Sequence, residues 1–141
     1  MTRLLLRCLL LCCLGLLSTA ALAGGKGPTR ALELAQYTWS AAIRWNDFEG
    51  AWNLVDPQVR AEHPLTDLDF SRYQQVQISS YRERGGVALS DGEVEREIEI
   101  GVINRNTQVE RTVRFREHWR YDPQIKTWWQ TSGLPDLWQE Q

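Results

Sequence analysis

The sequence predicts an α+β domain in which N-terminal helices pack on a four-stranded antiparallel meander. Between about residues 29 and 73, apolar side chains recur every three or four positions, which is the spacing of amphipathic helices. From about residue 76 to residue 132, apolar and polar side chains alternate, which is typical of strands with one buried face. Only short, turn-forming segments separate these later stretches, and short connections join neighbouring antiparallel strands.

The first helix is expected from about Thr29 to Trp45. Thr29 follows Pro28 and suits an N-cap, because its hydroxyl can accept a hydrogen bond from a free backbone N–H group. Trp45 and Leu34 are expected to widen its apolar face. That face consists of residues at helical spacing: Leu32, Ala35, Trp39, Ala42 and Ile43.

A second helix is expected over Phe48–Val55. Asn46, followed three residues later by Glu49, is typical of a capping box at a helix start. Asp56-Pro57 is expected to end this helix, because the residue before a proline resists the helical conformation.

A third short helix, from Thr66 to about Tyr73, is expected just before the sheet, with Thr66 and Asp69 as its capping pair. Four strands then follow. They are expected at Val76–Arg84, Glu93–Asn104, Gln108–Tyr121 and Thr127–Ser132.

The pattern of the central hairpin predicts its register. If Arg105 and Asn106 form the tip, apolar residues face each other on one side of the sheet and acidic residues face basic ones on the other. Each exposed ion pair contributes only about 0.2–1 kcal/mol, so we expect these charges to fix the register and keep the outer face hydrated. The expected pairs are Val102 with Val109, Ile98 with Val113, Glu97 with Arg114, and Glu95 with Arg116.

Three charged residues fall on the apolar face of this hairpin. Arg96, Arg111 and Glu117 share it by parity, and an unpaired buried charge is costly. In the expected register Arg96 faces Phe115 and lies diagonally beside Glu117. The candidate site is therefore an Arg96–Glu117 pair at the mouth of a cavity, with Arg111 and Trp119 as further cavity residues. The alternative is a structural ion pair, or a bulge that turns one side chain outward.

The first 23 residues are typical of a secretory signal peptide. Two arginines give a positive start, residues 8–17 are almost wholly apolar, and Ala21–Ala23 offers a small-x-small cleavage pattern. Cleavage is expected after Ala23, with Ala20 as a second point, and residues 24–28 would form a flexible spacer. The apolar run is short for a bilayer span, so we expect a periplasmic or secreted protein without a stable membrane span, rather than an anchored one.

The expected mature chain holds a single domain at residues 29–138 and contains no cysteine, since all three cysteines lie in the leader. Disulfides and thiolate metal sites are thereby excluded from it. Its net charge is −4 and it has no basic patch, which argues against a nucleic-acid partner. All seven tryptophans lie in it, and we expect them to supply core volume rather than to line a pocket.

Two stretches resemble the small cone-shaped domains of nuclear transport factor two. They are the helix entry WNDFEGAWNLVDP at residues 45–57 and the closing strand WWQTSGLP at residues 128–135. With the long hairpin between them, the chain resembles the cystatin-like α+β superfamily and, more narrowly, small exported proteins of Gram-negative bacteria. The resemblance implies a curved sheet around a helix and a conical cavity. The superfamily includes enzymes such as ketosteroid isomerase and scytalone dehydratase beside non-enzymatic binding modules, so it leaves the function open.

An enzyme of this kind needs a carboxylate base or a His–Asp pair in the cavity, and a donor for the developing oxyanion. Glu117 alone is expected to point inward, and Arg96 beside it is expected to lower its pKa, which makes a poorer base. His63 is expected in a solvated loop, and His118 on the outer face opposite Glu93. We therefore assign no catalytic residue, no cofactor and no metal site.

We expect an exported, non-catalytic domain that binds a small amphipathic ligand in its cavity or a protein partner in the cell envelope. The charged outer face of the sheet could pair with itself in a homodimer. The alternative is a small isomerase-like or dehydratase-like enzyme that uses Glu117 as its cavity carboxylate.

Overall fold

The computed structural model describes residues 26–139, so the expected leader and its cleavage point lie outside the described residues. The chain divides into one unit that ends at Arg30 and a second that begins at Ala31 and contains the sheet. Within residues 26–139, no helix is both long and apolar enough to cross a membrane.

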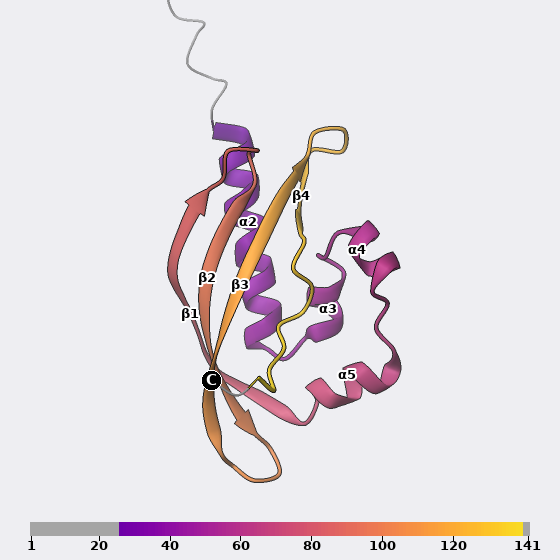
Figure 1. Ribbon diagram of the computed structural model, residues 1–141, viewed down its shortest axis with the longest axis vertical. Helices are drawn as coiled ribbons and strands as arrows, with labels where there is room; N and C mark the ends of the chain where they lie inside the picture. The colour runs from indigo at the N-terminus through magenta and orange to yellow at the C-terminus, as the bar shows by residue number, and fades with distance from the viewer. Residues whose placement is uncertain (1–25, 140–141) are drawn as a thin grey trace, which may run out of the picture. The chain divides into compact units, whose positions relative to one another are not determined.

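In the described chain, four helices come before the sheet (Figure 1). They are α2 (Lys26–Arg44), α3 (Phe48–Trp52), α4 (Pro57–Glu62) and α5 (Asp67–Tyr73). The expected first helix is present as α2, but it begins at Lys26, so Thr29 lies inside the helix and is not its N-cap. The expected third helix is confirmed as α5. The predicted capping pair of α5 is also present: Thr66 accepts a hydrogen bond from the backbone N–H of Asp69, whose carboxylate accepts one from the backbone N–H of Thr66.

The expected bounds and cap of the second helix are wrong. α3 ends at Trp52, because Val55 leaves the helix and forms a parallel bridge with Gln130. Its N-cap is Asp47, whose carboxylate accepts a backbone hydrogen bond in the first turn, and not Asn46.

The sequence analysis missed α4. Asp56-Pro57 was interpreted only as the end of a helix, but the same pair begins the next one. Asp56 is the N-cap of α4 and accepts a hydrogen bond from the backbone N–H of Gln58, while Pro57 takes the first helical position, where its missing N–H costs nothing.

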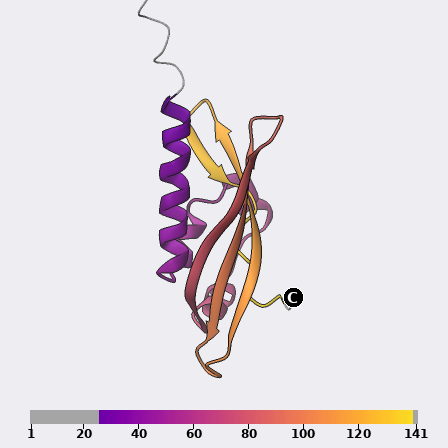
Figure 2. The ribbon, with the colours of Figure 1, turned by 90° about the vertical axis from the view of Figure 1, so that its left-hand side faces the viewer.

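The sheet is an antiparallel meander with strand order β1-β2-β3-β4, as predicted, and the fold is α+β. Figure 2 shows α2 along one face of this sheet. The strands are β1 (Val76–Ala88), β2 (Val94–Asn104), β3 (Glu110–Asp122) and β4 (Thr127–Gln130).

The predicted register of the β2–β3 hairpin is wrong by two residues. The backbone N–H of Asn104 donates to the carbonyl of Val109 at 2.9 Å, so residues 105–108 form a four-residue loop. Arg96 therefore lies directly opposite Glu117, and none of the four predicted pairs is directly opposed. A shift of two residues leaves every side chain on its own face, so alternation alone does not distinguish the two registers.

The charges of the outer sheet face pair with one another. Glu95 and Arg116 form the predicted ion pair at 3.2 Å, although they meet diagonally. Within residues 26–139, Glu97 and Arg114 do not form the other predicted ion pair; Arg114 instead lies opposite Glu99. Glu99 binds an arginine of β1 at 2.6 Å.

The core lies between α2, α3 and the inner face of the sheet. Trp39 and Trp119 meet edge to face at its centre, with ring centroids 6.2 Å apart, so these two tryptophans supply core volume as predicted. The buried apolar residues around them include Ile43, Phe48, Ala51, Val55, Val76, Tyr81, Ile98, Ile100, Val102 and Val113.

Side chains from the end of α2 cover the open edge of β1. The Asn46 amide donates to the carbonyl of Val76 at 2.8 Å and accepts from the N–H of Ile78 at 3.2 Å, as a neighbouring strand would. Arg44 donates to the carbonyl of Tyr81 at 3.0 Å. Because exposed edges promote pairing with other chains, these contacts protect the first half of β1.

We expect Asn46→Gly to lower the free energy of unfolding by about 1–3 kcal/mol, because it leaves the partly buried N–H of Ile78 without its partner and removes one of the two hydrogen bonds to the Val76 carbonyl, the other coming from Arg105. Glycine keeps the positive φ of 59° that Asn46 adopts, so the loss reports the side chain. Denaturant unfolding is the measurement. The matched control is Asn106→Gly in the exposed β2–β3 loop, and equal losses in both variants would show that Asn46 does not protect the edge.

Candidate functional site

The predicted cavity residues do not all lie together. Arg96 of β2 and Glu117 and Trp119 of β3 form one buried cluster. Arg111 lies elsewhere, where its guanidinium donates to the backbone carbonyl of Leu137 at 2.9 and 2.5 Å. Arg111 therefore holds the C-terminal segment against the sheet.

Donors surround the Glu117 carboxylate on both oxygens. Its Oε1 accepts a hydrogen bond from the hydroxyl of Tyr81. Its Oε2 accepts from Arg96 Nε at 3.0 Å, from Arg96 Nη2 at 2.6 Å and from the indole N–H of Trp119 at 3.0 Å. The exposed fraction of Glu117 is 0%, so the carboxylate is sealed inside the domain.

Burial raises the pKa of the Glu117 carboxyl from 4.5 to about 8, because the charged form loses its water. The indole N–H groups of Trp119 and Trp39 favour the charged form and limit the shift, although only that of Trp119 forms a hydrogen bond with the carboxylate. The sequence analysis expected a lowered pKa for Glu117, and this net direction is wrong, because the loss of water outweighs the effect of the neighbouring Arg96 guanidinium. Burial also lowers the pKa of Arg96, while the charge and the hydrogen bond of Glu83 act in the opposite direction and raise it.

Arg96 links this buried carboxylate to the surface. Its Nη1 donates to Glu83 at 3.0 Å, and the Glu83 side chain is half exposed. Arg96, Glu83 and Tyr81 form the β-strand wall of a pocket of about 300 Å³, whose other wall is α2. A ligand in this pocket would meet Arg96 and Tyr81, while Glu117 lies behind them.

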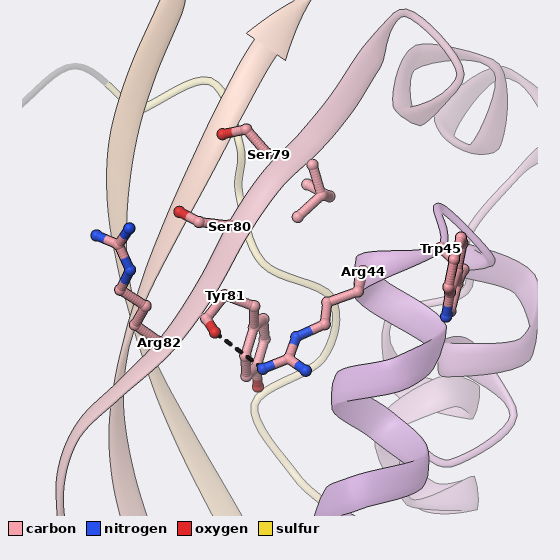
Figure 3. Close-up of a pocket in the computed structure, with 7 residues that line it drawn as sticks. Arg44, Trp45, Ser79, Ser80, Tyr81 and Arg82 are labelled. Atoms are coloured by element: carbon pink, nitrogen blue, oxygen red, sulfur yellow. Dashed lines mark hydrogen bonds between the residues drawn. The ribbon is translucent and has the colours of Figure 1, made fainter.

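A larger pocket of about 480 Å³ lies between the C-terminal end of α2 and the edge of β1 (Figure 3). Arg44 and Trp45 line it from the helix side, and Ile78, Tyr81 and their neighbours line it from β1. In Figure 3, Arg44 reaches across toward the Tyr81 carbonyl, while Arg82 extends away from it. We call this space the α2–β1 pocket.

Arg44 is the charged group at the centre of this surface, because it lines both pockets. One N–H group bonds the Tyr81 carbonyl, and the guanidinium lies 5.6 Å from the centre of the Tyr81 ring. Among the described residues, no carboxylate pairs with Arg44. Its charge is therefore available to a ligand.

Both histidines lie away from Glu117. His63 is exposed after α4, as expected. His118 is on the outer sheet face, also as expected, but the register places it opposite Glu95 instead of Glu93, with its Nε2 3.4 Å from the Glu95 carboxylate. In the part of the chain that the structure describes, no group of three His, Cys, Asp or Glu side chains is placed to hold a metal ion.

The sequence analysis missed Arg44 and Trp45 as site residues. It placed Trp45 and Leu34 on the apolar face of the first helix, but their exposed fractions are 84% and 65%, so both placements are wrong. At 100° per residue, Trp45 lies about 240° around the helix from Trp39, and this angle would have indicated its exposure. Nothing in the sequence indicates that Arg44 lies beside the edge of β1.

Comparisons of the chain with protein-family models, with curated proteins and with solved structures gave no match, so its resemblance to the superfamily stays a prediction.

Proposed function

We propose that the protein is an exported, non-catalytic binding module that holds a small amphipathic ligand in the α2–β1 pocket. The observation that carries the proposal is the unpaired guanidinium of Arg44 in the wall of a 480 Å³ pocket. Pockets for small molecules have volumes of about 300–1,000 Å³ and combine apolar walls with a few placed polar groups.

The chemistry of the walls indicates the ligand class. Arg44 offers a planar set of N–H donors that suits a carboxylate or a sulfonate. Trp45 and Ile78 offer apolar surface beside it. The ligand would therefore have an anionic head and an aromatic or aliphatic body.

The covered edge of β1 supports a small ligand over an envelope protein that adds a strand. Added strands bind through the free backbone groups of an edge. Here Asn46 and Arg44 already bond the outward groups of Val76, Ile78 and Tyr81.

The alternative function is an isomerase-like or dehydratase-like enzyme. The pKa of about 8 favours it, because an acid–base group works best with a pKa near the working pH. The sealed position of Glu117 favours the non-catalytic proposal, because no substrate atom could reach either oxygen without displacing Tyr81 or Arg96. Glu117→Gln tests the alternative, which requires a ketone-isomerising or dehydrating activity that this change abolishes while the fold persists.

We expect anilinonaphthalene sulfonate, an aromatic anion, to bind the folded protein with saturation at one site per chain. Arg44→Gln should weaken this binding about tenfold, because a charge-assisted contact contributes about 1.5–3 kcal/mol. Fluorescence titration measures it, with circular dichroism as the check of folding.

The matched control is Arg114→Gln, which removes an equal charge from the outer sheet face. Its affinity for the probe should equal that of the unchanged protein. Saturable binding that both variants weaken equally would place the probe elsewhere, and an absence of saturable binding would contradict the proposed pocket.

We also propose that the leader is removed on export to the periplasm or the medium. The intact mass of protein from the periplasmic fraction should then correspond to a chain that begins at Gly24, or at Ala21 if cleavage follows Ala20. A mass that corresponds to all 141 residues, or to a chain carrying lipid, would contradict a soluble exported form.

A further inference from the structure

Helix α2 and the residue after it carry a second set of apolar side chains, outside the face that packs on the core, and two of them, Tyr37 and Trp45, also border the pockets beside β1. Leu34, Tyr37 and Trp45 have exposed fractions of 65%, 71% and 84%, and Ala41 lies between them on the same side. We call these four residues the outer stripe. Figure 2 shows the sheet and the other described helices on one side of α2, and the exposed fractions show that the described chain leaves Leu34, Tyr37 and Trp45 largely open to solvent.

The outer stripe is unusual for the surface of this domain. A helix that packs on one sheet needs one apolar face, and Trp39 and Ile43 already provide it. The stripe lies outside that face. Clustered exposed apolar side chains on a soluble domain mark interaction surfaces more often than isolated ones do.

The charges beside the outer stripe indicate which kind of partner would bind it. Glu33 and Arg44 lie on the same flank of the stripe, 11 residues and about 16 Å apart along the helix. Among the described residues, neither side chain forms an ion pair. A surface with an acid at one end and a base at the other, on one flank, is complementary to its own copy turned end for end.

We infer that a second copy of this chain packs on the outer stripe, with the two α2 helices antiparallel about a two-fold axis at the level of residue 39. Such an axis brings Glu33 of each copy beside Arg44 of the other. It also brings Leu34 beside Trp45, and Tyr37 beside Ala41, so apolar residues meet apolar residues. The contact is isologous and closes at two copies.

Arg44 can serve both this contact and the α2–β1 pocket. Its guanidinium has five N–H donors, and Tyr81 uses one of them. Arg96 shows the same arrangement within this chain, since it bridges two carboxylates, Glu83 and Glu117.

The outer sheet face is the weaker surface for self-association. Several of its charges already pair with one another, as in the contacts of Glu99 with Arg84 and of Glu95 with Arg116. Burying these pairs would cost the water that they now hold. On the outer stripe, burial covers apolar surface and adds ion pairs. We therefore assign the contact surface of the homodimer to α2, and not to the outer sheet face that the sequence analysis considered.

Sedimentation velocity of the purified, processed protein tests the inference. We expect a dimer at micromolar concentration, and we expect Leu34→Ser to raise its dissociation constant at least about tenfold. The control is Leu68→Ser on α5, which removes an equally exposed leucine, at 73%, away from the stripe, and should leave the dimer intact. Circular dichroism of each variant checks the fold.

A charge exchange tests the antiparallel arrangement separately. Glu33→Arg alone and Arg44→Glu alone should each weaken self-association, because like charges would then meet. Mixing the two variants should restore a one-to-one dimer, since each arginine of the first then meets a glutamate of the second. A monomeric unchanged protein at 100 µM, a dimer that survives Leu34→Ser, or a mixture that stays monomeric would overturn the inference.

Discussion

Replacing Arg96 with methionine is expected to lower the free energy of unfolding by about 3–5 kcal/mol at pH 9, and by less at pH 6. At pH 9, above its folded pKa of about 8, Glu117 is ionised and needs the guanidinium as its partner. At pH 6 the Glu117 carboxyl is protonated, so the loss of the Arg96 guanidinium costs less. Denaturant unfolding across this pH range measures the difference.

The direction of this pH dependence follows from the difference between the folded and the unfolded pKa of Glu117. The folded pKa of Glu117, about 8, lies above the 4.5 of the unfolded chain. Its contribution to stability is therefore fully present below about pH 4.5 and is lost as the pH rises through 8. Without Arg96 the folded pKa is higher still, so the loss at alkaline pH is larger.

The control is the double change Arg96→Met with Glu117→Leu. It removes both members of the buried pair and should recover most of the stability, because neither charge is then left unpaired. Recovery will be partial, since Tyr81 and Trp119 lose the acceptor of their hydrogen bonds. A cost of Arg96→Met that does not vary with pH would contradict the assigned ionisation of Glu117.

Truncating Trp39 to alanine is expected to lower the free energy of unfolding by about 3–5 kcal/mol. Trp39 is fully buried and packs edge to face on Trp119, so its removal leaves a cavity at the centre of the core. The comparison is Trp45→Ala in dilute, monomeric protein, where the same truncation removes an exposed ring and should cost less than about 0.5 kcal/mol. A loss below about 1 kcal/mol for Trp39→Ala would place that residue outside the core.

The periodic segments of the fold could be predicted from the sequence. α2 has a face of apolar residues at helical spacing, and α5 has both members of its capping box, so local patterns suffice for each. Alternation over the long strands, with short turns between them, determines the meander because neighbouring strands must pair.

The hairpin register could not be predicted from alternation, because it depends on the loop. The side chain of Asn104 accepts hydrogen bonds from the backbone N–H groups of Asn106 and Thr107, and Gln108 takes a positive φ of 59°. These contacts stabilise a four-residue loop in place of the expected two-residue tip. The pairing then shifts by two positions without moving any side chain to the other face.

The candidate site was only partly predictable. Parity placed Arg96 and Glu117 on one face and so predicted that they would pair. It could not show that Tyr81 seals the carboxylate, because an irregularity between Ile78 and Ser80 in β1 reverses the alternation and turns Tyr81 inward. The pocket beside Arg44 requires the distance between a helix end and a sheet edge, which no local pattern contains.

The central claim is that the ligand binds at Arg44 and that the buried Arg96–Glu117 pair is structural. Titrating anilinonaphthalene sulfonate into the Arg96→Met, Glu117→Leu double variant, beside Arg44→Gln, tests this claim most directly. We expect the double variant, once shown to be folded, to bind the probe within about twofold of the unchanged protein, and Arg44→Gln to bind about tenfold more weakly. A tenfold loss in the folded double variant, with normal binding by Arg44→Gln, would place the site at the buried pair instead.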